Sequence, residues 1–238
     1  MVIAALLAGG TGKRLGSAVP KQFIPLGGRP VLLHSLFAFT ESGLIDRCVL
    51  SVPAGYVSLA RELIKNAGAT GVPVDVMGGG ENRSDTLRRI LLFLDANGLL
   101  KESVLLTHDA VRPFISRRII EDNIAAVRAC GACNTCVPAT DTVFLSRDGR
   151  FISDVPPRST VFHAQTPQSF RGDKLLALIE ALPPEEFAQM TDGCSVYARF
   201  GLPVALVQGD RDNVKLTYPE DIERAEEILR RREKREDP

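Results

Sequence analysis

Apolar runs and amphipathic stretches alternate along the first half of the chain. Continuous apolar runs predict buried strands at residues 2–8, 47–52, 72–77 and 103–107. Helical spacing predicts helices at residues 31–39, 57–67 and 83–94, and a fourth from the capping residue Ser116 to about residue 129. Because strands and helices alternate, we expect an α/β fold with a mostly parallel sheet and helices on both of its faces.

The alternation stops between residues 139 and 169. The sequence ATDTVFLSRDGRFISDVPPRSTVF predicts two strands around a turn at Arg147–Asp148–Gly149, as a hairpin that projects from the domain. A two-stranded ribbon is marginal by itself, so we expect a second copy of the chain to cover it. Further on, the sequence predicts a strand at 203–207 and a charged helix over 218–238.

The charge balance excludes several classes of partner. The 238 residues carry 29 Lys plus Arg and 29 Asp plus Glu, so no overall basic field favours nucleic acid or a membrane surface. No apolar run has the length of a membrane helix, and the first residues predict a strand rather than a signal peptide. We therefore expect a cytoplasmic protein.

Three of the five cysteines, Cys130, Cys133 and Cys136, have a spacing that iron–sulfur proteins also use. The position of the fourth ligand in such a run holds no cysteine, however. Gly131 instead predicts the end of a helix, and residues 133–138 predict a strand. We therefore interpret these cysteines as small apolar residues. The three histidines are scattered and show no metal-ligand spacing.

The first predicted strand continues into a glycine-rich basic loop, in the sequence AALLAGGTGKRLG. A Walker A loop would need Gly where Leu7 stands and Ser or Thr where Arg14 stands. A dinucleotide fingerprint would need Gly where Leu15 stands. The loop matches neither pattern. Its small residues and the cations Lys13, Arg14 and Lys21 would suit a triphosphate.

Clusters of glycines and polar residues also follow three other predicted strands. With the residues between them, they are Gly78, Gly79, Gly80, Glu81, Asn82 and Arg83; His108, Asp109, Arg112 and Pro113; and Asp212, Asn213, Val214 and Lys215. Taken singly, each set could be an ordinary surface turn. Because the carboxyl ends of parallel strands meet at one sheet edge, the sets together predict a ligand site there.

Seven motifs, in order, carry a resemblance that covers nearly the whole chain. They are LLAGGTGKRLG with PKQF, GGGENRSDTL, THDAVRPF, DTV, R with AQTPQSF, TDGCS and DNVKLTYPEDI. Together they resemble the cytidylyltransferases that join CTP to a polyol phosphate. The resemblance implies a three-layer Rossmann-like nucleotide-diphospho-sugar transferase fold, with residues 1–238 as a single domain. It also implies that a phosphate oxygen of the acceptor attacks the α-phosphorus of CTP and that pyrophosphate leaves.

The resemblance implies roles for individual residues. The catalytic cations would be Arg14, Lys21 and Lys215, which neutralise charge on the phosphates. The CTP-binding residues would be Leu7, Ala8, Gly9, Gly10, Thr11, Gly12, Lys13, Gly80, Glu81, Arg83, Thr86, Asp109 and Ala110. The acceptor-binding residues would be Arg112, Thr142, Arg158, Thr166, Thr191 and Asp192. Mg²⁺ would be the cofactor, held mainly by the CTP phosphates with Asp109 as its protein ligand.

In the family that the chain resembles, the hairpin is an arm that reaches across a homodimer. Residues 139–163 would form this dimerisation arm. Thr142 and Arg158 would then hold the acceptor phosphate in the partner's site, and Thr191 and Asp192 would border the acceptor in their own subunit.

Two branches of the family differ in the acceptor. One makes CDP-methylerythritol in isoprenoid synthesis, and the other makes CDP-ribitol, largely for teichoic-acid-type wall polymers. The segments AGGTG, FISDVPPR and TDGC resemble the ribitol branch more closely. We therefore expect D-ribitol 5-phosphate as the acceptor, with 2-C-methyl-D-erythritol 4-phosphate as the alternative. A nucleotidyltransferase for another sugar phosphate is the second alternative, and a different base would change the cytosine-reading segment from Gly80 to Thr86.

Overall fold

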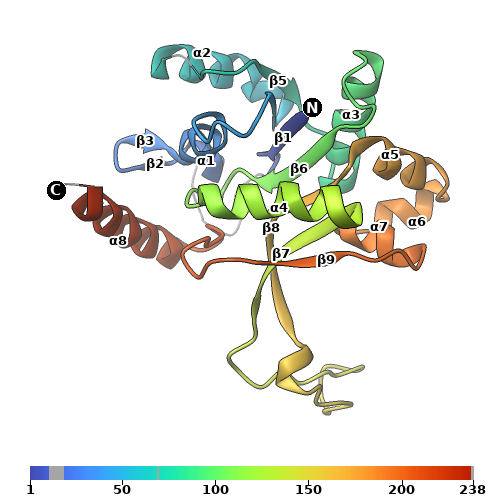
Figure 1. Ribbon diagram of the computed structural model, residues 1–238. Coiled ribbons are helices and arrows are strands. Elements are labelled where there is room, and N and C mark those ends of the chain that lie inside the picture. Colours follow the sequence, from blue (N-terminus) through green and yellow to red (C-terminus); the bar gives the residue numbers. More distant parts are fainter. Residues whose placement is uncertain (11–18, 69, 237–238) are drawn as a thin grey trace.

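The computed structural model describes residues 1–10, 19–68 and 70–236, and within them seven strands form the main sheet (Figure 1). They are β1 (Val2–Leu7), β4 (Arg47–Val52), β5 (Val74–Gly78), β6 (Val104–Asp109), β7 (Ala132–Pro138), β8 (Phe162–Arg171) and β9 (Ala205–Gln208). Their spatial order is β5-β4-β1-β6-β8-β7-β9. Strand β8 is antiparallel to β6 and β7, and the other neighbouring strands are parallel. The predicted mostly parallel sheet is confirmed.

Helices cover both faces of this sheet. One face carries α1 (Val31–Thr40), α2 (Val57–Ala67) and α4 (Arg117–Cys130); the other carries α3 (Arg83–Ala96), α5 (Gly172–Glu180), α6 (Pro184–Gln189) and α7 (Gly193–Arg199). Because successive side chains of a strand point to opposite faces, Leu6 packs in the first core and Leu7 in the second. A strand covered on both sides needs apolar residues at every position, and β1 has them. The three-layer α/β arrangement is confirmed.

The last helix, α8 (Pro219–Glu236), packs on a small ribbon rather than on the main sheet. The ribbon consists of β2 (Pro25–Leu26) and β3 (Arg29–Pro30), which follow a short 3-10 helix, η2 (Lys21–Phe23). Gly27 has φ +55°, and a Cβ atom there would overlap the side chain of Leu229. The positive φ favours glycine at this position, and Leu229 would have to shift to make room for a larger residue.

The predicted ends of α4 are also confirmed. The Ser116 side chain accepts a hydrogen bond from the N–H of Ile119 at 3.4 Å, and Gly131 ends the helix with φ +86°. The following strand β7 covers the segment that the cysteine analysis assigned to a strand. Cys133 and Cys136 are buried there as free thiols.

The sequence did not predict the elements between the hairpin and β9. These elements are β8 and the three helices α5, α6 and α7. Buried residues in β8 include Gln165, Thr166, Gln168 and Ser169, which are polar. A strand with these residues has no apolar run to reveal it, because hydrogen bonds rather than apolar contacts satisfy its side chains.

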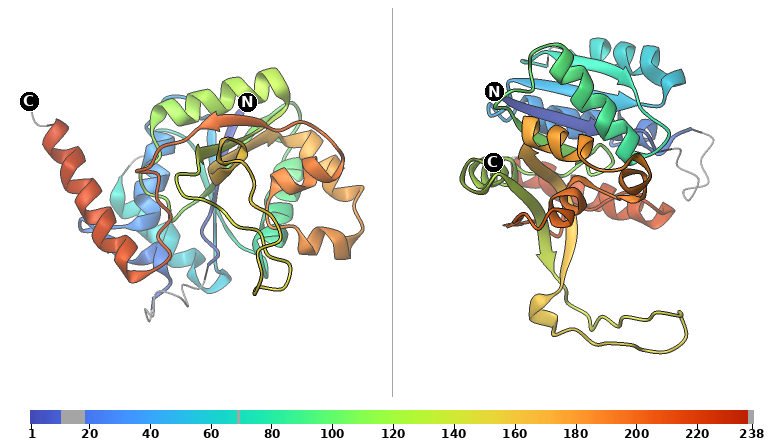
Figure 2. Two further views of the ribbon diagram at one scale, coloured as in Figure 1. Left: turned by 90° about the horizontal axis from the view of Figure 1, so that it is seen from below. Right: turned by 90° about the vertical axis from the view of Figure 1, so that its right-hand side faces the viewer.

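Residues 139–161 form an arm that projects from the body of the protein (Figures 1 and 2). It continues from the ends of β7 and β8, where Pro138 pairs with Phe162. The prediction of two strands within it is wrong. The arm, all of which the structure describes, has one isolated β-bridge, between Leu145 and Asp154, and a 3-10 helix, η4 (Arg158–Thr160), but no strand ladder. Pro156 and Pro157 lack the N–H groups that a ladder needs, which is one physical reason.

No helix within the described residues combines the length and the apolar character that a membrane span needs.

Candidate active site

A cavity of about 360 Å³ lies beyond the carboxyl ends of β1 and β6. Its lining residues are Leu7, Ala8, Gly9, Gly10, Lys21, Gln22, Gly80, Glu81, Asn82, Arg83, Thr86, Asp109, Val111 and Lys215. They come from four segments that are far apart in the sequence, as the strand topology predicts. Most of the residues that the sequence assigned to CTP, together with Lys21 and Lys215, therefore lie around one cavity.

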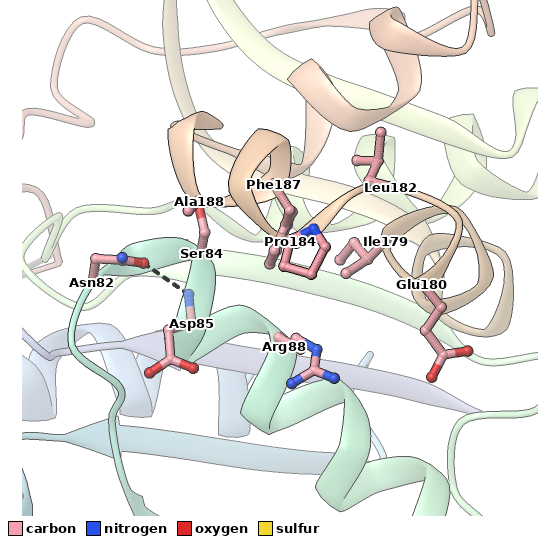
Figure 3. Close-up of a pocket in the computed structure, with 10 residues that line it drawn as sticks. All are labelled: Asn82, Ser84, Asp85, Arg88, Ile179, Glu180, Leu182, Pro184, Phe187 and Ala188. Carbon is pink, nitrogen blue, oxygen red and sulfur yellow. Dashed lines mark hydrogen bonds between the residues drawn. The ribbon is translucent and has the colours of Figure 1, made fainter.

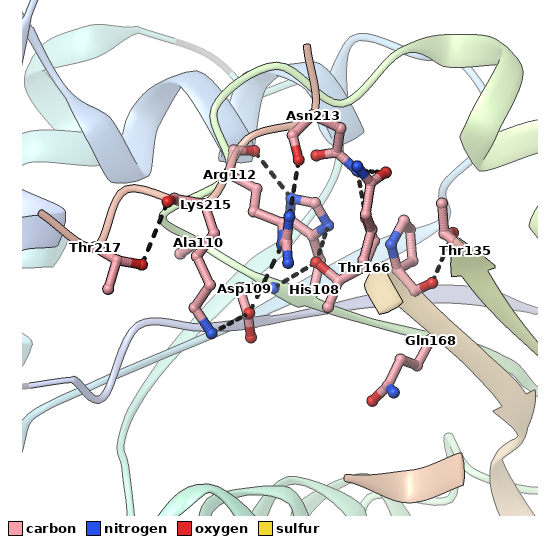
Figure 4. Close-up of polar contacts among 12 residues, drawn as sticks. His108, Asp109, Ala110, Arg112, Thr135, Thr166, Gln168, Asn213, Lys215 and Thr217 are labelled. Carbon is pink, nitrogen blue, oxygen red and sulfur yellow. Dashed lines mark hydrogen bonds and ion pairs between the residues drawn. The ribbon is translucent and has the colours of Figure 1, made fainter. Parts of the chain in front are cut away.

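Asp109, at the end of β6, is the buried centre of a cationic cluster (Figure 4). Its Oδ2 atom lies 2.8 Å from Lys215 Nζ, its Oδ1 atom lies 3.5 Å from Arg83 Nε, and Oδ2 is 3.8 Å from Arg112 Nε. Burial alone would raise the pKa of Asp109, but the charges of Arg83 and Lys215 hold that pKa below its ordinary value. The cluster is thus one carboxylate among three cations, with positive charge to spare for an anionic ligand.

Lys21 reaches the same cavity from η2. Its Nζ atom donates a hydrogen bond to the carbonyl oxygen of Leu216 at 2.7 Å, so it lies next to the segment that carries Lys215. Gln22 beside it is fully buried, and its Nε2 donates to the carbonyl oxygen of Ala8. This amide ties the end of β1 to η2. Sequence patterns assigned no role to Gln22 beyond its place in PKQF, because no pattern distinguishes a buried amide from an exposed one.

The segment before α3 is folded tightly against the cavity. Asn82 caps the helix by accepting from the N–H of Asp85 at 2.9 Å. The N–H of Gly80 donates to Thr86 Oγ1 at 3.0 Å, and the N–H of Glu81 donates to Asp85 Oδ2 at 3.0 Å. Both N–H groups are thus bonded within this segment.

Arg83 links the cavity to the residues expected beside the acceptor. Its Nη2 donates to Gln168 Oε1 at 3.3 Å, and its Nη1 donates to the carbonyl oxygen of Thr191 at 3.4 Å. Asp192 caps α7, where its Oδ1 accepts from the N–H of Ser195 at 2.8 Å. The structure therefore places Thr191 next to the cationic cluster, and Asp192 at the start of the adjacent helix.

His108 is fully buried beneath the cluster, and its two ring nitrogens are both bonded. Its Nε2 must donate to the Arg112 carbonyl oxygen, 3.1 Å away, because a carbonyl only accepts. Its Nδ1 then accepts from the Thr166 hydroxyl at 2.9 Å, whose oxygen accepts from the Asp109 N–H at 3.1 Å. Burial lowers the pKa of His108 to about 4. This histidine is a neutral structural group, not an accessible base.

Ala110, Thr142 and Arg158 are not part of the cavity lining. Ala110 is buried, and its N–H donates to the carbonyl oxygen of Leu7 at 3.0 Å. Thr142 and Arg158 are exposed on the arm, where Arg158 Nη2 donates to Thr142 Oγ1 at 3.3 Å. Thr11, Gly12, Lys13 and Arg14 lie outside the described residues.

A second cavity, of about 510 Å³, lies between α3 and the α5–α6 segment (Figure 3). Ile179, Leu182 and Phe187 give it apolar walls, and Asp85 and Arg88 lie along its α3 side. Asn82 lines both cavities. This cavity was not predictable from the sequence, because α5 and α6 were not predicted.

A model of the 2-C-methyl-D-erythritol 4-phosphate cytidylyltransferase family matches residues 2–231. The chain belongs to this family. It is a CTP-dependent cytidylyltransferase, as its motifs predicted. The preference for the ribitol branch is not supported, because both the family model and the similar structures favour the methylerythritol alternative.

Solved structures give the same result. The chain resembles 4-diphosphocytidyl-2C-methyl-D-erythritol synthase from Anaerococcus prevotii, with 27% identity, a TM-score of 0.81, and coverage of 97% of this chain and 98% of that one. It resembles 2-C-methyl-D-erythritol 4-phosphate cytidylyltransferase from Thermus thermophilus, with 28% identity, a TM-score of 0.74, and coverage of 97% and 100%. A further 4-diphosphocytidyl-2C-methyl-D-erythritol synthase is 29% identical, with a TM-score of 0.77 and coverage of 96% and 98%.

Proposed function

We propose that this enzyme transfers CMP from CTP to 2-C-methyl-D-erythritol 4-phosphate and releases pyrophosphate. The observation that carries the proposal is the family match across residues 2–231. The solved structures with that activity in their names, which align over almost their whole length, support it. The AGGTG and TDGC segments that favoured ribitol are then variations within the methylerythritol family.

The reaction needs charge neutralisation more than proton transfer. A phosphate oxygen of the acceptor, already an anion at neutral pH, forms a bond to the α-phosphorus of CTP. The bond from that phosphorus to the oxygen bridging the β-phosphorus breaks, and its electron pair leaves with pyrophosphate. Positioning and electrostatic stabilisation therefore supply most of the catalysis. The cationic cavity suits this chemistry, and the neutral His108 below it is not required as a base.

Lys21 and Lys215 would act on the phosphates from within the cavity, with Arg14 contributing from the first loop. Lys215 is 41% exposed and bonded to Asp109. When it turns to a phosphate, Asp109 keeps Arg83 and Arg112 nearby, so the buried carboxylate does not lose its charge compensation. This arrangement would let one lysine exchange a carboxylate partner for the reacting phosphate.

A magnesium ion fits this site as a companion of CTP. The described residues contain no group of three or more His, Cys, Asp or Glu that could hold a metal ion, and the cavity offers the carboxylates of Asp109 and Glu81. An ion that keeps waters and binds phosphates needs only one or two carboxylates. Asp109 would hold it from the protein side. When bound, the ion would supply positive charge that reduces the repulsion between the two anionic substrates.

The arm supports a homodimer as the working form. Its exposed apolar side chains are Phe144, Leu145, Phe151, Ile152 and Val155. Such a group outside a protein core marks an interaction surface. We propose that it packs on a second copy of the chain, which would bring Thr142 and Arg158 to the partner's acceptor phosphate.

The test is pyrophosphate release from CTP and Mg²⁺, with 2-C-methyl-D-erythritol 4-phosphate and ribitol 5-phosphate supplied separately. A methyl group contributes only ~1–3 kcal/mol to discrimination, so we expect about a 10- to 100-fold higher kcat/KM for the methylerythritol acceptor. UTP and GTP serve as nucleotide controls. A preference for ribitol 5-phosphate would contradict the acceptor assignment, and a preference for UTP would contradict the assignment of the base.

A further inference from the structure

Lys215 lies on a segment with no regular structure of its own. Residues 209–218 connect β9 to α8 without forming a helix or a strand. Backbone hydrogen bonds hold it at both ends, where the Gly209 N–H donates to the Cys136 carbonyl oxygen at 2.8 Å and the Leu216 N–H donates to the Val111 carbonyl oxygen at 2.9 Å. Between these ends, the position of the segment depends on hydrogen bonds from its other residues.

Asn213, two residues before Lys215, anchors the segment from within (Figure 4). It is fully buried, and its Nδ2 donates to the Thr166 carbonyl oxygen at 2.8 Å and to Gln165 Oε1 at 3.3 Å. The backbone carbonyl oxygen of Asn213 accepts a hydrogen bond from Arg112 Nη1 at 2.8 Å. One residue therefore attaches the segment both to β8 and to the arginine beside Asp109.

Thr166 is shared by the two sides of the ion pair. Its carbonyl oxygen accepts from Asn213, and its hydroxyl oxygen accepts from the N–H of Asp109 at 3.1 Å. Lys215 and Asp109 are thus placed relative to the same residue of β8. Their 2.8 Å contact follows from this common attachment as well as from their charges.

Gln165 reinforces the anchor. Its Nε2 donates to the Asp210 carbonyl oxygen at 2.7 Å, and its Oε1 accepts from the Asp210 N–H at 3.3 Å. A Cβ atom at Gly209 would overlap Gln165 Oε1. The glycine therefore lets the amide of Gln165 approach the segment closely.

We propose that Asn213 is a positioning residue, whose buried amide holds Lys215 in place against Asp109 and the phosphates of CTP. The proposal rests on the catalytic role proposed above for Lys215. If Asn213 contributed only to stability, its loss would lower the unfolding temperature and leave turnover of the folded protein unchanged. Acting through Lys215, it instead affects turnover only while that lysine is present.

A double-mutant cycle separates these roles. Asn213→Ala, Lys215→Ala and the double variant are compared by pyrophosphate release, at a temperature where unfolding curves show each to be folded. A misplacement of a catalytic group by about 1 Å can lower the reaction rate about 100-fold. We therefore expect Asn213→Ala to lower kcat by about 10- to 100-fold, with a smaller change in KM for CTP. The double variant should match Lys215→Ala within about threefold, since a positioning effect disappears with its target.

The matched control is Asn123, another fully buried amide, whose Nδ2 donates to the Ile119 carbonyl oxygen and to Thr135 Oγ1. Asn123→Ala should lower stability and leave kcat within about threefold of the wild-type value. If Asn213→Ala does not fold, Asn213→Ser takes its place in the cycle.

Two results would overturn the proposal. One is wild-type kcat in folded Asn213→Ala, and the other is a double variant whose losses multiply. If the single variant Lys215→Ala alone retained wild-type kcat, the proposed catalysis by Lys215 would fail, and the role of Asn213 with it. Failure of the catalytic role of Lys215 is distinguished from failure of the positioning role of Asn213, because the first is seen in a variant that leaves Asn213 unchanged.

Discussion

The cavity and the arm differ in the side chains they bury and expose. Around the cavity, buried polar groups such as His108, Thr166 and Asn213 are bonded to one another and to the backbone. On the arm, apolar side chains face outward, with Phe151 75% exposed, and a single isolated β-bridge takes the place of a strand ladder. The cavity is thus formed by contacts within one chain, whereas the arm leaves apolar surface uncovered.

The difference indicates how the proposed work is divided. A site for CTP needs fixed charges, and the rigid sheet edge supplies them within the chain. Contact with the acceptor phosphate would come from Thr142 and Arg158, which are exposed on the arm. The arm itself projects away from the sheet and its helices (Figures 1 and 2). The following predictions test each half of this division, beginning with the largest expected effect.

Lys21→Ala should lower kcat by about 100- to 1000-fold, the usual effect of removing one preorganised charge from a transition state. Lys65→Ala, which removes an exposed lysine from α2, is the control and should leave kcat unchanged. Pyrophosphate release and thermal unfolding are measured on both. Near-normal turnover of Lys21→Ala would contradict catalysis by charge neutralisation.

Thr166→Val keeps the shape of the side chain but removes the hydroxyl between Asp109 and His108. The buried Asp109 N–H and His108 Nδ1 then lose their partner, so the free energy of unfolding should fall by about 1–3 kcal/mol. Urea unfolding measures this. Thr70→Val, in a loop outside the cavity, removes a hydroxyl bonded to the Val72 carbonyl oxygen and should change stability by about 0.5 kcal/mol or less. Equal effects of the two variants would contradict a tightly satisfied network.

Phe151→Ser should weaken the dimer about 5- to 30-fold, because truncation of a buried interface aromatic typically costs about 1–2 kcal/mol or more. Analytical ultracentrifugation over a concentration series gives the dissociation constant. Leu59→Ser, at an exposed apolar position of α2, is the control and should leave it unchanged. A dimer unaffected by Phe151→Ser would remove the arm from the interface.

The smallest effect is expected at the buried cysteines. Burial raises the pKa of Cys133 to about 12, so its thiol stays protonated at pH 8. An alkylating reagent should label the exposed Cys130 in the native protein but not Cys133, whereas all five cysteines should react after denaturation. Cys133→Ala should retain turnover within about twofold. Stoichiometric iron or zinc bound at Cys133 would contradict the structural role.

The first half of the fold was predictable because its strands are buried on both faces and therefore appear as apolar runs, as β1 does. Strand β8 was not, because its buried positions include Gln165, Thr166 and Gln168, which are satisfied by hydrogen bonds. The prediction of strands in the arm was wrong for the opposite reason. Its apolar residues suggested strands, although they have no ladder partner and lie exposed.

The site was predictable to the extent that strand ends bring glycines and cations together. Lys21, Asp109 and Lys215 line one cavity as expected. The supporting amides, Gln22 and Asn213, lay within quoted motifs but had no assigned role, because their burial is decided by distant segments. The identity of the acceptor was harder still to predict, since the preference depends on a few substitutions in the loops rather than on the fold.

The central claim, that one chain forms the CTP site and the partner's arm completes it, is tested by mixing Lys21→Ala and Arg158→Ala chains. Each variant alone is expected to be impaired at every site. In a verified heterodimer, the site with Lys21 receives the arm with Arg158, so about half of the wild-type activity should return, as expected for a symmetric dimer with one intact site. Heterodimers no more active than the parent variants would contradict the crossing arm.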